Sequence, residues 1–392
     1  MTSIAELLAA AEPRTPRPLV GLVERLRASG RLRSDEVGRH LATKVAGGVT
    51  DDSRAVRGGG IFVAIPGAHV DGHQFATDAV ARGAIGLIVE HRVAEVPAHV
   101  VQLVIDRSQV ALADAAAWWY GDPGRELGVL GITGTDGKTS TGFLAAAALA
   151  AAGVPTGLVG TVATQIGGTR ETNSEHATTP GAPQLQSALR AMVAAGDRAA
   201  IVETTSHGLA LERVGGVGYD VAILTNLSHE HLEFHGSFEA YRAAKRSLFE
   251  RLATGPANPP KPRVSWPRAG IVNADDPAAP IFAAATEVAG ARLVTYGEAE
   301  GADVRIRSVD EADGRLRVAF DAPSGAADLR LRLAGRFNAW NALAVVAFGE
   351  AIGLDPARVR AGLEGLAGVP GRMDRVEAGQ PFGVVVDYAH SP

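Results

Sequence analysis

Cysteine is absent from this sequence of 392 residues, and its absence excludes two kinds of structure. Disulfide bonds and thiolate metal sites both require cysteine, so neither stabilises this chain, which suits a reducing cytosol. An excess of positive charge is also lacking, because the formal net charge is −5. This charge argues against nucleic acid or a polybasic membrane contact as the main partner.

Long apolar segments are missing as well. The longest apolar run covers residues 143–154, which is too short to span a bilayer. The first residues contain Glu6 and lack the basic start and apolar core of a signal peptide. We therefore expect a cytoplasmic protein without membrane insertion and without a nucleic-acid partner.

The length of the chain predicts two or three domains. Apolar runs at 61–65 and 84–90, with a helical stretch between them, predict a small α/β domain over residues 1–126. A second domain is predicted over residues 127–366, where apolar runs alternate with helix-length segments, as in a mostly parallel sheet. These buried-strand runs are 127–133, 199–205, 220–226, 268–273 and 291–297.

The later part of the chain has a different pattern. Residues 304–309, 315–320 and 328–333 alternate apolar with polar side chains, which predicts half-buried antiparallel strands, and a helix is expected at 338–353. The Pro-rich segment 254–267 is predicted to be an exposed loop. We expect residues 367–392 to begin a third, Rossmann-like domain, with one strand in FGVVVDYAHSP (382–392).

The segment GTDGKTS (134–140) lies between a predicted strand and a helix predicted over 138–152. Backbone N–H groups at a helix N-terminus attract anions, and Gly134 and Gly137 allow the backbone to approach one closely. Lys138 adds a positive charge, and Thr139 or Ser140 can reach a Mg²⁺ ion. This shortened phosphate-loop motif predicts a nucleotide site, whereas a dinucleotide fold is disfavoured because G-x-G-x-x-G is absent here.

Two neighbouring predicted strands end in polar residues, ETTSHG (203–208) and TNLSHEH (225–231). Ligands of open parallel sheets bind beyond the carboxyl ends of the strands. Glu203 and His231 are therefore candidate metal ligands beside the phosphate loop.

Lys245 falls on the apolar face of a predicted helix, four residues after Tyr241 and three before Leu248. A buried lysine is costly unless it is paired or neutral. One interpretation is a buried stem whose amine reaches water. The other is a lysine carbamylated by CO₂, which would become a carboxylate able to coordinate magnesium.

Two hydrolase chemistries are disfavoured by spacing. His229, His231 and His235 cluster in sequence, but the zinc motif H-E-x-x-H would require a histidine where Glu233 stands. Ser206 lacks the flanking G-x-S-x-G of a nucleophile elbow.

Taken together, these motifs resemble those of the Mur ligases, most closely the UDP-N-acetylmuramoyl-tripeptide synthetases. GTDGKTS is similar to the family's GTNGKT, with Asp136 in place of asparagine. TNLSHEHLEFHG (225–236) is similar to TNLSRDHLDYHG, and AYRAAKRSLF (240–249) contains the lysine that is carbamylated in that family. The other matching segments, in order along the chain, are 53–75, 176–180, 203–209, 335–341, 369–376 and 384–392.

The resemblance implies a role for each matching position. For ATP and its phosphates it implies the loop residues Gly134, Thr135, Asp136, Gly137, Lys138, Thr139 and Ser140, with Asn338 and Asn341 at adenine and Arg372 and Asp387 at phosphate and ribose. For two Mg²⁺ ions it implies Thr139, Glu203, His231 and carbamylated Lys245. For the UDP-sugar peptide it implies Ser53 at the uridine nucleotide and, at the muramoyl-peptide, Thr178, Thr179, Thr205 and Arg213.

The implied reaction is ATP-driven amide ligation in peptidoglycan biosynthesis, with Lys138, Lys245 and His231 as catalytic residues. The D-glutamate carboxylate of UDP-N-acetylmuramoyl-L-alanyl-D-glutamate forms an acyl phosphate, which the amine of a diamino acid attacks. The implied amino acid is meso-diaminopimelate or, second, L-lysine. We expect a monomer.

Two departures from the family pattern affect these expectations. Asp136 places a carboxylate beside the phosphates, which should weaken ATP binding unless it is paired. Of the family's third domain, about 100 residues or more at typical domain size, only the beginning is expected here. The alternative interpretation is therefore an incomplete fragment, or a non-ligating homologue that binds ATP and UDP-sugar.

Overall fold

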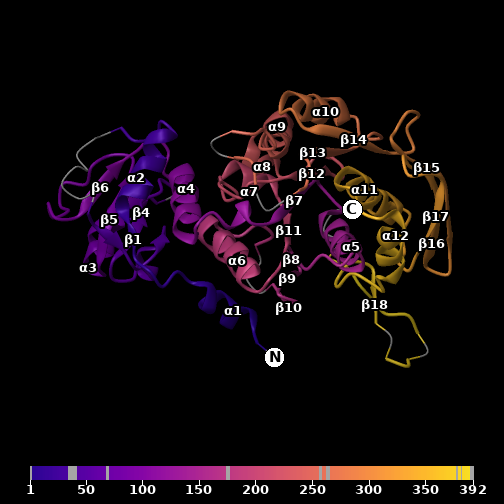
Figure 1. Ribbon diagram of the computed structural model, residues 1–392, viewed down its shortest axis with the longest axis horizontal. Coiled ribbons are helices and arrows are strands. Elements are labelled where there is room, and N and C mark those ends of the chain that lie inside the picture. Colours follow the sequence, from indigo (N-terminus) through magenta and orange to yellow (C-terminus); the bar gives the residue numbers. More distant parts are fainter. Residues whose placement is uncertain are drawn as a thin grey trace.

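The computed structural model describes residues 2–33, 42–67, 70–173, 177–255, 258–261, 265–376, 378–380 and 382–388. A small N-terminal unit lies at one end of the molecule, and a larger unit built on one long sheet occupies the rest (Figure 1). Both units mix helices with parallel strands, which confirms the predicted α/β class.

The N-terminal unit is built on a four-stranded sheet in the order β3-β4-β5-β6, and all its neighbouring strands are parallel. Ile61, Val63 and Ile88 are buried against the tryptophan-bearing helix α4 and form the core of the unit. The strands are β3 (Val49–Thr50), β4 (Gly60–Val63), β5 (Ala84–Val89) and β6 (Val101–Val104), and β1 (Arg17–Pro18) pairs with β2 (Lys44–Val45). The helices are α1 (Ile4–Ala11), α2 (Leu19–Ala28), α3 (Ala76–Ala81) and α4 (Ser108–Tyr120), with short turns η2 (Ser53–Ala55), η3 (Gly72–Phe75) and η4 (Pro123–Arg125).

The larger unit contains an eleven-stranded sheet in the order β10-β9-β8-β11-β7-β12-β13-β14-β15-β16-β17. Strands β8 to β15 in this order are parallel, and both ends of the sheet are antiparallel. The parallel strands are β8 (Thr156–Val159), β11 (Ala199–Glu203), β7 (Gly128–Thr133), β12 (Val221–Leu224), β13 (Ala269–Asn273), β14 (Arg292–Gly297) and β15 (Val304–Ala312). The antiparallel additions are β9 (Ala163–Ile166), β10 (Thr169–Thr172), β16 (Arg315–Asp321) and β17 (Ala327–Leu331).

Helices cover both faces of this sheet, so its central strands are buried and read as continuous apolar runs. Side chains of α5, α11 and α12 share one core with the sheet, and side chains of α6, α9 and α10 share the other. The helices are α5 (Lys138–Ala151), α6 (Ala182–Ala194), α7 (Ser206–Ala210), α8 (Leu232–His235), α9 (Phe238–Glu250), α10 (Ala279–Val288), α11 (Phe337–Ile352) and α12 (Pro356–Gly365).

The Pro-rich loop prediction is partly wrong. Asn258 and Lys261 are buried, and the Lys261 amine donates to the Leu127 carbonyl (3.0 Å) and to the Asp220 carboxylate (2.5 Å). Proline disfavours strand and helix, but it does not keep a loop on the surface. Here the buried ion pair between Lys261 and Asp220 holds the segment against the starts of β7 and β12. Residues 256–257 and 262–264 of this prediction lie outside the described residues.

The strand expected in 382–392 is present but short. Within the described residues the strand is β19 (Val385–Val386), which pairs with β18 (Asp374–Arg375), and both valines of β19 are exposed. An apolar run becomes a long buried strand only where neighbouring layers cover it, and the described residues provide no such cover. Residues 389–392 lie outside the described part of the chain.

Candidate functional site

The phosphate loop predicted at 134–140 joins β7 to α5, as expected. Gly137 has φ +80° and directly precedes α5, and Gly134 has φ +151°. A side chain on Gly134 would collide with the Thr225 hydroxyl, and one on Gly137 would collide with the Asn341 amide oxygen. Both glycines are therefore required by close contact as well as by backbone conformation.

The loop is fixed to the end of β12 by backbone hydrogen bonds. The Thr135 N–H donates to the Asn226 carbonyl (2.9 Å), and the Asp136 N–H donates to the Asn226 side-chain oxygen (3.0 Å). The Thr225 hydroxyl donates to the Asp136 carbonyl (2.5 Å). The Asp136 backbone is thus held while its side chain is exposed, which leaves its carboxylate beside the loop, where it would repel a bound phosphate.

Lys138 folds back over the loop. Its amine donates to the carbonyls of Gly134 (2.9 Å) and Thr135 (2.7 Å). Burial lowers the pKa of the Lys138 ammonium, and the Glu203 carboxylate opposes that shift. The Lys138 amine predicted for this loop therefore lies against the loop backbone.

Glu203, at the end of β11, is fully buried beside the loop. One carboxylate oxygen accepts from the hydroxyls of Thr139 (3.0 Å) and Thr161 (2.8 Å), while the other has no hydrogen-bond partner. Burial raises the pKa of the Glu203 carboxyl, against the Thr161 hydrogen bond and the Lys138 charge. An unpaired buried carboxylate oxygen is costly without a cation, so this group fits a hard ion such as Mg²⁺.

Lys245 lies on the buried face of α9, as predicted, with 2% of its surface exposed. Its amine donates to the Gly134 carbonyl (2.6 Å) and lies 4.6 Å from the centre of the Tyr241 ring. The interpretation in which the amine reaches water is therefore wrong. Burial lowers the pKa of Lys245 well below its ordinary value, and the Lys138 charge lowers it further.

His231 begins the short helix α8 with a left-handed backbone (φ 55°). Its ring stacks edge-on against His207, with 4.7 Å between ring centres, and its Nε2 lies 3.6 Å from a Glu230 oxygen. The ring centre is 6.4 Å from that of Tyr241, which also contacts the Lys245 amine. The structure therefore places His231 and Lys245 around one aromatic ring.

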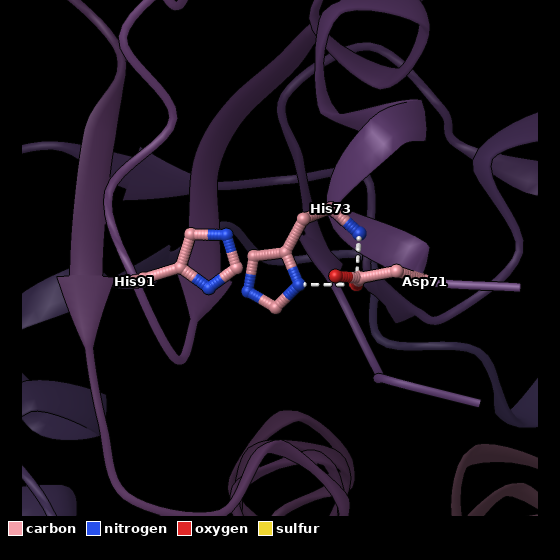
Figure 2. Close-up of side chains that lie close together, drawn as sticks. All are labelled: Asp71, His73 and His91. Carbon is pink, nitrogen blue, oxygen red and sulfur yellow. Dashed lines mark hydrogen bonds and ion pairs between the residues drawn. The ribbon is translucent and has the colours of Figure 1, made fainter. Parts of the chain in front are cut away.

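Among the described residues, one group of three histidines or carboxylates has ligand atoms close enough to share an ion: Asp71, His73 and His91. Figure 2 shows His73 between the other two side chains. Its Nδ1 bonds the Asp71 carboxylate (2.6 Å) and its Nε2 accepts from the Glu90 N–H (2.9 Å), so both ring nitrogens are occupied by protein. This group stabilises the N-terminal unit, and the zinc interpretation of His229, His231 and His235 gains no support.

The predicted adenine and ribose residues also reach the loop region. Asn341 accepts from the Thr141 hydroxyl (3.3 Å) and donates to Asn338 (3.0 Å), and both asparagines are buried. The Arg372 charge acts on Lys138, and the Arg372 Nε is buried without a hydrogen-bond partner. Asp387 accepts from the Met373 N–H (2.7 Å), which fixes the turn carrying Arg372.

The predicted peptide-binding residues form one hydrogen-bonded group. Thr179 bonds the Glu203 carbonyl (2.8 Å) and Thr205 (3.0 Å), and its own carbonyl accepts from Arg213 (3.0 Å). Thr178 reaches Glu203 through Thr161, with 3.0 Å between the two threonine hydroxyls.

Ser53 does not join this group. It lies in the N-terminal unit, where it lines a cavity of about 600 Å³ together with Asp51, Asp52, Arg54, Phe75, Asp78 and Arg82. Asp51 is exposed at this cavity, and the Arg213 charge of the central unit acts weakly on its carboxylate.

Two contacts of the site are not predicted by the sequence: the hydrogen bond from Thr161 to Glu203 and the one between Tyr241 and Thr135. Thr161 lies between β8 and β9, two strands that were not predicted, so no pattern placed its hydroxyl beside Glu203. Tyr241 was read as an apolar position, although its hydroxyl bonds Thr135 (2.9 Å).

Comparison with known proteins defines the class. The Mur ligase middle domain matches residues 132–349, and the catalytic domain of the Mur ligase family matches residues 46–120. The first match spans more than half of the chain. The chain therefore belongs to the Mur ligase family.

Individual relatives show which members of the Mur ligase family this chain is similar to. The UDP-N-acetylmuramyl-tripeptide synthetase of Roseiflexus sp. (strain RS-1) is 46% identical over 349 residues, which are 88% of this chain and 68% of the relative. The UDP-N-acetylmuramoyl-L-alanyl-D-glutamate–2,6-diaminopimelate ligase of Bacillus licheniformis is 40% identical over 341 residues, 87% of this chain and 67% of the relative. A solved structure of a ligase with that second name has a TM-score of 0.76 at 25% identity, covering 93% of this chain and 69% of the other.

Within the described residues, no helix has both the length and the apolar character needed to cross a membrane.

Proposed function

We propose that this protein is an ATP-dependent amide ligase that adds a diamino acid to UDP-N-acetylmuramoyl-L-alanyl-D-glutamate in the cytoplasm. The names of the relatives at 46% and 40% identity support this substrate. One observation carries the proposal: the phosphate loop, the unpaired oxygen of Glu203 and the buried amine of Lys245 meet around Gly134 and Thr139. We propose meso-diaminopimelate as the amino acid, with L-lysine second.

The chain offers separate groups for each part of the nucleotide. The phosphate loop with Lys138 would hold the phosphates, and the buried pair Asn338 and Asn341 would offer amide groups to adenine. Arg372 and Asp387 approach from the segment that follows α12. Thr139 and Glu203 would hold one Mg²⁺, and His231 and carbamylated Lys245 a second.

The surroundings of Lys245 support the proposed carbamylation. Carbon dioxide reacts with a neutral amine: the Nζ–C bond forms and one proton leaves the nitrogen. Burial and the nearby Lys138 charge favour the neutral amine by lowering the pKa of Lys245. The product is a carboxylate within the same buried group, where it would add the negative charge that a divalent cation requires.

The reaction needs positioning and charge neutralisation rather than a protein nucleophile. A carboxylate oxygen of the D-glutamyl residue attacks the γ-phosphorus of ATP, and ADP leaves. The diamino acid amine then attacks the acyl carbon, phosphate leaves, and the nitrogen loses a proton. Mg²⁺, when bound, supplies positive charge that offsets the repulsion between carboxylate and triphosphate. Lys138 would supply further positive charge from the protein. The peptide would be oriented by Thr178, Thr179, Thr205 and Arg213.

Phosphate release tests this function. We expect release that requires ATP, Mg²⁺, the UDP-linked dipeptide and one diamino acid together, with meso-diaminopimelate more effective than L-lysine. Binding of ATP and UDP-sugar without phosphate release would favour the non-ligating alternative. The domain limits at 126/127 and 366/367 and the monomeric state stay predictions, which limited proteolysis and light scattering can test.

A further inference from the structure

Tyr241 occupies the centre of the site although no nucleotide or peptide role was assigned to it. Its side chain is fully buried on α9, one turn before Lys245. The Tyr241 hydroxyl can donate one hydrogen bond and accept others, so it can contact two partners at once.

This hydroxyl lies between the phosphate loop and the segment that carries His231. On one side it is 2.9 Å from the Thr135 hydroxyl, and on the other it donates to Glu230 at 3.4 Å. The same Glu230 oxygen lies 3.6 Å from His231 Nε2. A continuous set of polar contacts thus runs from Thr135 through Tyr241 and Glu230 to His231.

Thr135 extends these contacts back to the strand end. Its hydroxyl oxygen accepts from the Ser228 N–H at 2.8 Å. Thr135 is 7% exposed, so little water is available to replace a lost bond. The orientation of this one hydroxyl therefore depends on both Ser228 and Tyr241.

We propose that Tyr241 is a positioning residue whose hydroxyl sets the phosphate loop at a fixed position relative to the His231 segment. The proposal rests on the proposed function only for its catalytic consequence. The hydrogen bonds from Tyr241 to Thr135 and Glu230, here called the Tyr241 tie, are present in the protein without nucleotide. They can therefore be measured separately from activity.

The test is amide hydrogen exchange on the nucleotide-free protein, comparing Tyr241→Phe with the parent protein. The substitution keeps the ring beside Lys245 and removes only the hydroxyl. We expect exchange at Ser228 and Thr135 to become about fivefold to tenfold faster, the effect of losing one buried hydrogen bond. Unchanged exchange at Ser228 would overturn the proposal, because the phenylalanine ring has no polar group that could replace the lost bond to Thr135.

Tyr219→Phe is the matched control. Tyr219 is also fully buried in the central unit, and its hydroxyl bonds a threonine, Thr204, at 3.0 Å. We expect this control to leave exchange at Ser228 unchanged. Equal acceleration in both variants would also overturn the proposal, since it would show general loosening. If Tyr241→Phe fails to fold, Thr135→Val removes the same hydrogen bond from the other side. Amide exchange would then be compared at Asp136 and in the His231 segment.

Kinetics separate this proposal from the proposed function. We expect Tyr241→Phe to weaken Mg·ATP binding about tenfold and lower kcat, with KM for the UDP-linked dipeptide unchanged. Added to Thr135→Val, it should cause no further loss, because Thr135→Val has already broken the connection between the loop and Tyr241. Faster exchange in a protein that shows no ligase activity even before substitution would refute the proposed function and leave the Tyr241 tie intact.

Discussion

At the scale of single residues, the site depends on buried polar groups that lack full compensation. Glu203 has one unpaired oxygen, and Lys245 is held by a single carbonyl. Such groups cost stability and persist where function requires them. Substitutions of Glu203 or Lys245 should therefore lower activity while the protein stays folded.

Lys245→Ala should abolish turnover while the fold persists, because it removes the proposed carbamate and a buried amine. Turnover is measured as phosphate release and folding by circular dichroism. Bicarbonate should restore activity to the parent protein after decarbamylation and should not restore the variant. Unchanged turnover in Lys245→Ala would remove the lysine from the mechanism.

Glu203→Gln should lower the apparent Mg²⁺ affinity by more than about 100-fold, because a direct oxygen ligand loses its charge. The unfolding temperature should stay equal or rise, since a buried carboxylate without a cation is costly. A Mg²⁺ titration of activity with a parallel thermal melt tests both parts. Normal Mg²⁺ dependence would exclude Glu203 as a ligand.

Asp136→Asn should tighten ATP binding. The Asp136 side chain is exposed beside the phosphate loop, so its carboxylate repels the triphosphate. A charge near a helix N-terminus is worth about 0.3–1 kcal/mol, which is roughly a two- to fivefold change in Kd. Calorimetric titration with Mg·ATP measures it, and equal or weaker binding would show that Asp136 is neutralised in the complex.

At the scale of elements, the segment 254–267 shows how one buried pair can determine the course of a loop. Lys261 and Asp220 are each about 2% exposed at the side chain. The pair joins the loop to the start of β12 and, through the Leu127 carbonyl, to the start of β7. No sequence pattern pairs a lysine with an aspartate 41 residues away.

Lys261→Met should destabilise the central unit by about 3 kcal/mol at pH 7, because it leaves Asp220 buried and unpaired. Burial lowers the pKa of Lys261 from 10.5 to about 8. Between these values the unfolded chain holds a proton that the folded protein releases, so stability should rise with pH across this window by up to about 3 kcal/mol.

Urea unfolding at several pH values measures this. The rise in the free energy of unfolding above a pH of about 8 should be present in the parent protein and absent in Lys261→Met. It should also be present in Lys44→Met, where an exposed lysine is removed. The same gain in Lys261→Met would assign it to another group.

At the scale of the whole molecule, hydrogen bonds and an ion pair join the N-terminal unit to the central unit. Arg190 of α6 donates to the carbonyls of Tyr120 (2.8 Å) and Gly121 (3.0 Å) and pairs with Glu126 (2.9 Å). Helix α1 adds a second connection, because its Ile4 is buried in the core of the central unit.

Arg190→Ala should loosen this connection. Trypsin cleavage after Arg125 should become about tenfold faster, since the charged bonds to two carbonyls are lost. The exposed Arg198, changed to alanine, is the control and should leave the rate unchanged. Identical cleavage of all three proteins would show that α1 and the remaining contacts suffice.

Local patterns in the sequence predict the strands that are buried on both faces, the phosphate loop and the position of Lys245 on the buried face of its helix. Each follows from a local cause: continuous apolar runs, glycine spacing and helical periodicity. The folded chain alone shows that one oxygen of Glu203 lacks a partner while Thr161 bonds the other, that Tyr241 bonds Thr135 and that Lys261 is buried. Those contacts join residues 41 to 106 positions apart, and local spacing carries no information about which distant side chains a fold brings together.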